Sequence, residues 1–115
     1  MQYKSQITTH ILDTSRGKPA SGITAKLYHF QHHVWEEIAA DVTNLDGRIV
    51  DLLPEGIRLE NGIYKMHFDT EKYFDHFNIP TFYPYIEIVF NLDSDEHFHI
   101  PLLLSPFGYT TYRGS

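Results

Sequence analysis

The chain has no cysteine, only one tryptophan, and few basic residues. Without cysteine, no disulfide, zinc–thiolate or iron–sulfur site can form, so packing and strand pairing must stabilise the fold. Nine lysines and arginines against 15 acidic residues give a net charge of −6. This argues against a nucleic-acid partner, because phosphate binding needs clustered basic side chains. No apolar run is long enough to span a bilayer, so no membrane partner is expected.

The length and composition are those of a small globular protein. The 115 residues are 42% hydrophobic and 15% aromatic, which predicts one folded domain over residues 1–115. The first 12 residues lack the apolar run of a signal peptide, and the chain ends in Arg-Gly-Ser rather than in a peroxisomal signal. We therefore expect a cytosolic protein, or a periplasmic one if a leader has been removed.

Alternating apolar and polar residues predict a mainly β fold with seven or eight short strands. Turn residues separate the strands at the spacing expected of a two-sheet β-sandwich. The predicted strands span residues 5–13, 23–30, 34–42, 48–51, 63–68 and 83–92, with a final hairpin over 97–113. Residues 14–22 and 52–60 are predicted loops, because they contain glycine, proline and serine.

One short helix is predicted over residues 71–77. Thr70 is the expected N-cap, and Glu71 favours the positive end of the helix. Tyr73, Phe74 and Phe77 would form its apolar stripe.

The last predicted hairpin has one unusual face. Phe98, Ile100 and the leucines that follow in alternation form a core face. The opposite face carries His97, His99, Pro101 and Leu103, because successive strand residues point to opposite sides. This mixture of polar and apolar residues is typical of neither a core nor a solvent-exposed surface. It indicates a face that another subunit covers, with chemistry in the cleft between them.

Two of the eight histidines are candidates for catalysis. His10 and His99 lie on the non-core faces of strands, and a neutral imidazole can accept or deliver a proton near pH 7. A turn over residues 43–47 delivers Arg48 to an edge segment. The remaining histidines are read as half-exposed polar residues or partners of acids: His29, His32, His33, His67, His76 and His97.

A zinc site and a serine triad are the two alternatives to catalysis by these histidines and Arg48. His97 and His99 share a strand face, and His10 could supply a third imidazole for a catalytic zinc, but no carboxylate is well placed to orient the rings. A serine triad lacks its Gly-x-Ser-x-Gly turn, and Ser105 before Pro106 is read as structural. The histidine and arginine set favours water-mediated hydrolysis of a small, polar, anionic compound, with no cofactor.

Several motifs carry a resemblance to a known family. Residues 9–14, 17–20, 43–48, 99–109 and the closing Tyr112-Arg-Gly-Ser115 are similar to those of the transthyretin-related 5-hydroxyisourate hydrolases. The similarity runs from about residue 6 to the last residue, and the closing tetrapeptide is its most specific part. It implies a transthyretin-like β-sandwich and a homotetramer built as a dimer of dimers, with active sites where dimers meet.

The same resemblance implies an activity in urate degradation and a set of site residues. The reaction is hydrolytic opening of the six-membered ring of 5-hydroxyisourate to 2-oxo-4-hydroxy-4-carboxy-5-ureidoimidazoline. The implied catalytic residues are His10, Arg48, His99 and Ser115. The implied substrate contacts are His10, Arg48 and Tyr112, the last of which would fill a channel that the hormone carrier of the same fold keeps open.

Three other functions remain as alternatives. A small-ligand carrier of the transthyretin type would need an open channel, which Tyr112 and His99 would obstruct. A metal-dependent hydrolase would use the three histidines named above and lose activity in excess chelator. A plain interaction module would leave the Tyr-Arg-Gly-Ser end unexplained.

Overall fold

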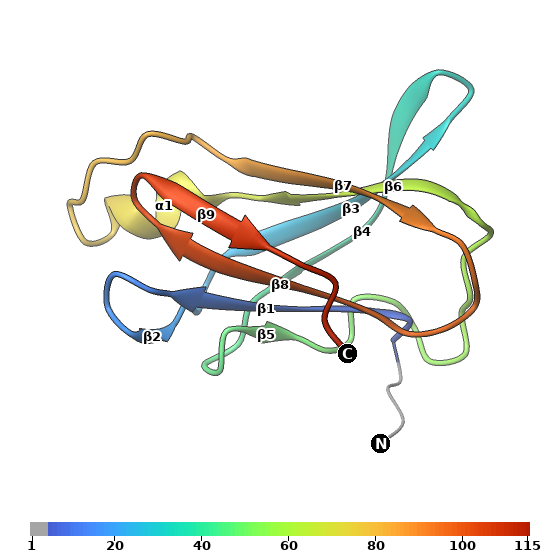
Figure 1. The fold of residues 1–115 in the computed structure, drawn as a ribbon, viewed down its shortest axis with the longest axis horizontal. Helices are drawn as coiled ribbons and strands as arrows, with labels where there is room; N and C mark the ends of the chain where they lie inside the picture. The colour runs from blue at the N-terminus through green and yellow to red at the C-terminus, as the bar shows by residue number, and fades with distance from the viewer. Residues whose placement is uncertain (1–4) are drawn as a thin grey trace.

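The computed structural model describes residues 5–115, which fold into two β-sheets with a short helix at one end (Figure 1). Within this range there are nine strands and one helix. Their bounds are β1 (Ile7–Asp13), β2 (Lys18–Pro19), β3 (Thr24–Gln31), β4 (Val34–Val42), β5 (Arg48–Ile49), β6 (Gly62–Phe68), α1 (Thr70–Asp75), β7 (Ile86–Leu92), β8 (Phe98–Ser105) and β9 (Gly108–Thr111). The predicted two-sheet sandwich is confirmed, with β2 as a short strand in the segment predicted to be a loop.

The first sheet is organised around the parallel pair of β1 and β8. Its order is β2-β1-β8-β9, and β5 also pairs with β1. The parallel register sets Thr8 opposite His99 and Ile11 opposite Leu102. The strands β2 and β5 pair in turn along the other edge of β1, both antiparallel. This sheet therefore brings segments that are about 90 residues apart in sequence side by side.

The second sheet is an antiparallel arrangement in the order β4-β3-β6-β7. Its β3–β4 hairpin projects beyond the body of the sandwich (Figure 1). His32 and His33 form the two-residue turn with φ of 55° and 64°, the backbone that such a hairpin turn requires. The short turn predicted at residues 31–33 is confirmed.

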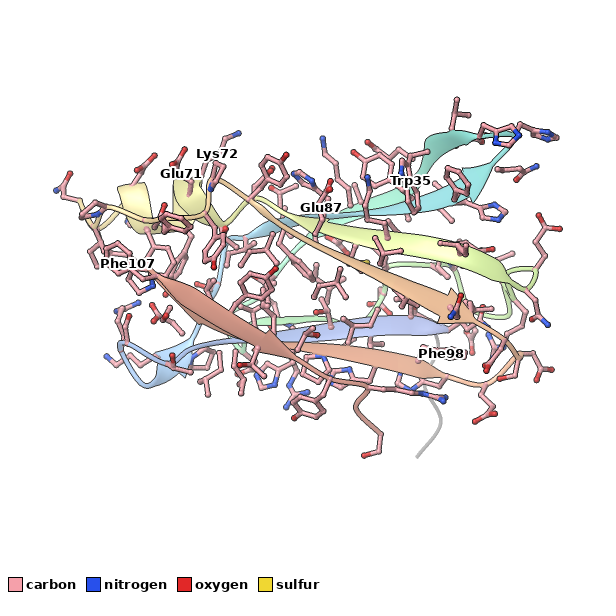
Figure 2. All side chains as sticks on the ribbon, turned by 45° about the horizontal axis from the view of Figure 1, so that its top comes forward. Trp35, Glu71, Lys72, Glu87, Phe98 and Phe107 are labelled. Atoms are coloured by element: carbon pink, nitrogen blue, oxygen red, sulfur yellow. The ribbon has the colours of Figure 1, made fainter. Side chains whose placement is uncertain are left out.

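The core lies between the two sheets. Figure 2 shows side chains filling this layer, with Trp35 and Glu87 on the outer side of the second sheet. Ile7 and Ile11 are fully buried, as the alternation of their strand predicted. Fully burying one such side chain stabilises the fold by roughly 1.5–3 kcal/mol. The largest fully buried side chains include Tyr64, Phe68, Phe74, Leu27, Met66, Leu92 and Leu102.

The helix differs from its prediction at its start. Asp69 is the N-cap but makes no capping bond with its side chain, and Thr70 lies inside the first turn. The predicted capping role of Thr70 is therefore wrong: its hydroxyl is buried and has no hydrogen-bond partner. The side chain of Asp69 instead contacts His67, 3.1 Å from its Nε2.

A buried carboxylate ties the helix to β1. Tyr73 donates its hydroxyl to Oδ2 of Asp13 at 2.8 Å, and Asp13 is fully buried. Ser15 donates to the other oxygen of Asp13 at 2.6 Å.

Among residues 5–115, no helix combines the length and the apolar character that crossing a membrane requires.

Candidate active site

His10 and Arg48 lie directly opposite each other on neighbouring strands. The antiparallel register of β1 and β5 pairs His10 with Arg48. His10 is half-buried and Arg48 is exposed. Because cross-strand partners on one face have their Cβ atoms about 4.5–5.5 Å apart, the imidazole and the guanidinium share one patch of the outer face of the first sheet.

The turn before Arg48 is held by its own hydrogen bonds. Oδ1 of Asn44 accepts from the backbone N–H groups of Asp46 and Arg48. Gly47 has a φ of 72°, and a Cβ there would lie 2.5 Å from the carbonyl oxygen of Ile11. Only glycine fits this backbone without strain, so the local sequence explains how the guanidinium is delivered to β1.

His99 is brought to the same face by the pairing of β8 with β1. Thr8 lies opposite it, and the Thr8 hydroxyl is 2.8 Å from Nδ1 of His99. The same hydroxyl is 2.8 Å from Nε2 of His97. Since Nδ1 of His99 is engaged by Thr8, Nε2 is the ring nitrogen left to face a substrate.

The C-terminal segment returns to cover His99. The backbone N–H of Gly114 donates to the carbonyl oxygen of His99 at 2.8 Å, forming an isolated β-bridge. A Cβ on Gly114 would lie 2.6 Å from Cδ2 of the His99 ring, so the backbone of Gly114 packs directly against the imidazole. Ser115 is the next residue along the chain and is exposed. Tyr112 is 57% exposed two residues before Gly114.

The imidazoles of this patch favour their neutral forms. Burial lowers the pKa of His10, and the positive charge of Arg48 lowers it further. Burial is also the main cause of the lowered pKa of His99, followed by the charges of His97, Arg48 and His10. A neutral imidazole has a free lone pair at pH 7 and can act as a base. The permanently charged Arg48 beside it can stabilise a developing anion.

The histidines are not arranged as a metal-ligand set. Over residues 5–115, no group of three or more histidines and acids is placed to hold a metal ion. The ring nitrogens that His97 and His99 turn toward each other are both hydrogen-bonded to Thr8. The hydroxyl of Thr8 thus occupies the point where a metal bound between the two rings would sit.

The structure places His10, Arg48 and His99 on one face of the first sheet, and their catalytic roles and that of Ser115 stay predictions. It also adds two residues that the sequence reading missed. His97 was read as an incidental polar histidine, but it shares a hydroxyl with His99. No role was predicted for Thr8. The signal for both was the His-x-His spacing, which became informative only with the register of β1 against β8.

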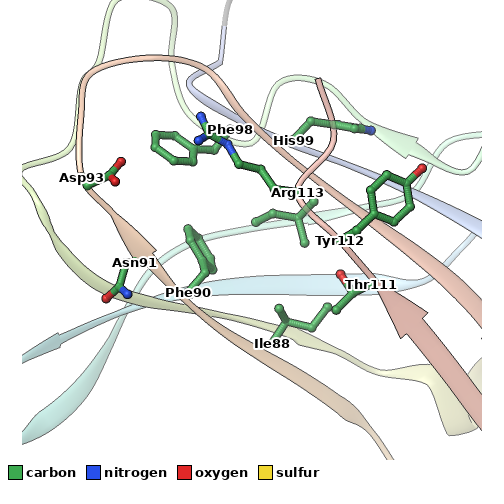
Figure 3. A pocket seen from close by; sticks show the side chains of 10 residues that line it. Ile88, Phe90, Asn91, Asp93, Phe98, His99, Thr111, Tyr112 and Arg113 are labelled. Atoms are coloured by element: carbon green, nitrogen blue, oxygen red, sulfur yellow. The ribbon is translucent and has the colours of Figure 1, made fainter.

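A cavity of about 260 Å³ meets this patch at His99 and otherwise lies apart from it. Figure 3 shows it between β7 and the C-terminal segment, with Ile88 and Phe90 on one side and Tyr112 and Arg113 on the other. His99 lines one side of it, whereas His10 and Arg48 do not line it. The cavity therefore marks the open edge of the sandwich, and the imidazole–guanidinium patch lies on the outer sheet face.

Comparisons with known proteins give this chain clear relatives. Residues 7–114 match the HIUase/Transthyretin family. The 5-hydroxyisourate hydrolase of Mus musculus is 46% identical over 114 residues, which cover 96% of each chain. The structure of Klebsiella pneumoniae 5-hydroxyisourate hydrolase superposes with a TM-score of 0.82 at 36% identity, covering 95% of this chain and 98% of that one.

A second solved structure has the same fold and a different ligand. Sea bream transthyretin, solved in complex with thyroxine, superposes with a TM-score of 0.89 at 32% identity and covers 96% of this chain and 95% of its own. The predicted transthyretin-like fold is confirmed. Because the hydrolase and the thyroxine complex share it, function has to be argued from side chains.

Proposed function

The chain belongs to the HIUase/Transthyretin family, and from this membership we propose that it hydrolyses 5-hydroxyisourate in urate catabolism. The product would be 2-oxo-4-hydroxy-4-carboxy-5-ureidoimidazoline. The observation that carries the proposal is the meeting of two imidazoles of lowered pKa with the guanidinium of Arg48 on one sheet face. Such a set can activate water and hold an anion without a thiol or a hydroxyl nucleophile.

The proposed reaction is attack of water on a ring amide carbonyl. One of His10 and His99 takes a proton from water as its oxygen bonds to the carbonyl carbon. Arg48 holds the anionic ring and stabilises the oxyanion, a role suited to its planar, charged fork. The ring C–N bond then breaks, and the other histidine delivers a proton to the leaving nitrogen.

The C-terminal segment is proposed to complete the site. Ser115 would orient the water or a histidine, and Tyr112 would contact substrate. The bridge between Gly114 and His99 supports this placement, because Gly114 stands between Tyr112 and Ser115 in the sequence.

The oligomer that we propose is a tetramer, a dimer of dimers with the active sites in the clefts between dimers. The strands β9 and β7 are the outermost strands of their sheets, and edge strands offer unpaired backbone groups to another chain. Val89, Tyr109 and Tyr112 are 58%, 41% and 57% exposed, respectively. Light scattering at micromolar concentration tests this, and a mass of one protomer would contradict it.

Two further expectations remain proposals. We propose that residues 1–115 act as one domain, because the buried residues of both sheets form one apolar cluster. The cytosolic location stays a prediction, and fractionation of the source cells would check it.

The direct test generates 5-hydroxyisourate in situ with urate oxidase and follows its disappearance with and without this protein. Acceleration over the spontaneous decay is expected. His10→Asn and Arg48→Lys should abolish turnover and leave the unfolding midpoint near that of the native chain. His33→Asn is a matched control, because His33 lies at the hairpin tip and asparagine tolerates its positive φ. Near-native rates in either site variant would refute the assigned roles.

A carrier function is the competing proposal, since sea bream transthyretin has the higher TM-score and was solved with thyroxine. In the proposed tetramer, the half-buried His99 and the 57% exposed Tyr112 would set polar groups in the channel that a carrier of apolar hormone needs open. Thyroxine titration by calorimetry separates the two functions. Micromolar binding without turnover would favour the carrier.

A further inference from the structure

A hydrogen-bonded chain of three side chains extends behind His99. The hydroxyl oxygen of Thr8 lies 2.8 Å from Nδ1 of His99 and 2.8 Å from Nε2 of His97. Thr8 is only 2% exposed, and its β-branched side chain has few accessible rotamers. The two rings are nearly parallel, with centroids 6.3 Å apart. The hydroxyl is therefore held at a fixed point between two imidazoles.

The single proton of the Thr8 hydroxyl couples the tautomers of the two imidazole rings. A hydroxyl has one proton to donate, so it donates to one ring and must accept an N–H from the other. When His99 donates from Nδ1, its Nε2 carries a lone pair and can act as a base. When the hydroxyl donates to His99, Nε2 carries the proton. The tautomer that His99 presents is thus coupled to that of His97.

We propose that Thr8 and His97 are positioning residues for His99: they orient its ring and take up the proton charge that it acquires. This inference rests on the proposed function, in which His99 exchanges a proton with water or with the leaving group. Thr8 and His97 reach the reaction only through His99, which is the group placed to touch substrate.

The proton path balances through the hydroxyl. Nε2 of His99 takes a proton from water, and Nδ1 then gives its own proton to the oxygen of Thr8. Thr8 passes its hydroxyl proton to Nε2 of His97, which becomes the imidazolium. His99 is neutral again and carries its proton on Nε2. Where His99 is instead the acid, the reverse sequence brings a proton from His97 to Nε2 of His99, which delivers it to the leaving nitrogen.

The charges around the two rings explain why such a transfer would help. The positive charge of a protonated His99 is opposed by His97, Arg48 and His10. Burial and, after it, the charge of Arg58 lower the pKa of His97. Moving the charge to His97 takes it away from the guanidinium that must also hold the anionic substrate. The half-exposed His97 can then exchange its proton with solvent.

Thr8→Val tests the relay, because valine keeps the shape of threonine and removes the hydroxyl. We expect kcat to fall by about ten- to a hundredfold, which is at or below the lower end of the range of about 10²–10⁴ that a positioned acid–base group contributes, while KM changes by less than about threefold. Thr8→Ser should restore most of kcat. His97→Phe, which keeps a ring without nitrogens, should lose as much as Thr8→Val.

Thr9→Val is the matched control. Thr9 is a buried threonine on the same strand, and its hydroxyl donates to the carbonyl oxygen of Ile100 at 2.6 Å instead of to an imidazole. Equal losses of kcat in Thr8→Val and Thr9→Val would show that the loss comes from general destabilisation, and this result would overturn the relay. Native kcat in either Thr8→Val or His97→Phe would overturn it as well.

A spectroscopic readout separates this inference from the proposed function. Ring ¹⁵N shifts of His99 report its tautomer without substrate, and they should move in Thr8→Val and in His97→Phe but not in Thr9→Val. If the native protein fails to accelerate decay of 5-hydroxyisourate, the proposed function falls, and the tautomer coupling is still measured by these shifts. Unchanged His99 shifts in Thr8→Val would refute the relay in an active enzyme.

Discussion

Gly114→Ala should remove activity without unfolding the protein. Gly114 is half-buried and lies on the C-terminal segment, three residues beyond β9 and two beyond Tyr112. Its backbone bridges His99, and a Cβ there would lie 2.6 Å from Cδ2 and 3.3 Å from Cγ of that ring. It would also lie 3.1 Å from Cγ of Pro101. A methyl group therefore has no room unless the ring or the segment moves.

The distance that the ring or the segment must move determines the expected loss of kcat. Non-bonded carbon atoms sit about 3.5–4.0 Å apart, so the methyl and the ring must separate by about 1 Å. Pro101 is rigid and buried, so the shift falls on His99 or on the C-terminal residues. A misplacement of about 1 Å can cost about a hundredfold in rate. Turning the ring about 30° off its rotamer costs roughly 0.5–1.5 kcal/mol, a small fraction of a typical folding free energy.

The assay compares kcat and the thermal midpoint of Gly114→Ala with those of Gly108→Ala. Gly108 is the matched control, because its nearest neighbour for a new Cβ is the Ser105 hydroxyl at an ordinary 3.8 Å. We expect a loss of about a hundredfold in kcat for Gly114→Ala and near-native kcat for Gly108→Ala, with both midpoints within a few degrees of the native one. Native kcat in Gly114→Ala would show that the segment does not determine the position of His99.

Three further predictions follow from the same structure. Because the pKa of His99 is lowered from the usual histidine value of 6.5, kcat/KM should stay level near pH 7 and fall only below pH 6.5. Folding stability should also fall below pH 6.5, because the unfolded chain binds the proton more readily. A pH–rate profile that falls above pH 7 would contradict this prediction. Gly47→Ala, with its Cβ 2.5 Å from the oxygen of Ile11 and a φ of 72°, should lower the free energy of unfolding by about 2 kcal/mol or more and reduce kcat; an unchanged urea midpoint would count against it. Tyr73→Phe removes a hydrogen bond to the buried Asp13 and should cost about 1.5–3 kcal/mol without changing kcat, as chemical denaturation and steady-state kinetics would show.

Much of the fold follows from local patterns. The alternation of residues 7–13 and 98–104 predicted which side chains enter the core, and Ile7, Ile11 and Leu102 are fully buried. The turn at residues 43–47 predicted the delivery of Arg48, because Asn44 and Gly47 suit the required backbone. Ser105, predicted to be structural, donates to the carbonyl oxygen of Gly108 at 3.0 Å.

The errors arise where tertiary contacts override local preference. Thr70 was expected to cap the helix, but packing buries its side chain in the first turn. The strand expected from residue 83 begins at Ile86, after Pro84, which lacks the N–H for a ladder. The two-residue strand β2 forms in a predicted loop because β1 offers it an open edge.

The amino-acid order alone determined on which faces of their strands His10 and His99 lie, since a strand alternates its side chains with a period of two wherever it is placed. It also determined the tight turn before Arg48. Only the tertiary structure decided that Thr8 meets His99 and that His10 meets Arg48. Register between strands up to 90 residues apart depends on the packing of the whole sandwich, and that packing made Thr8 and His97 neighbours of His99.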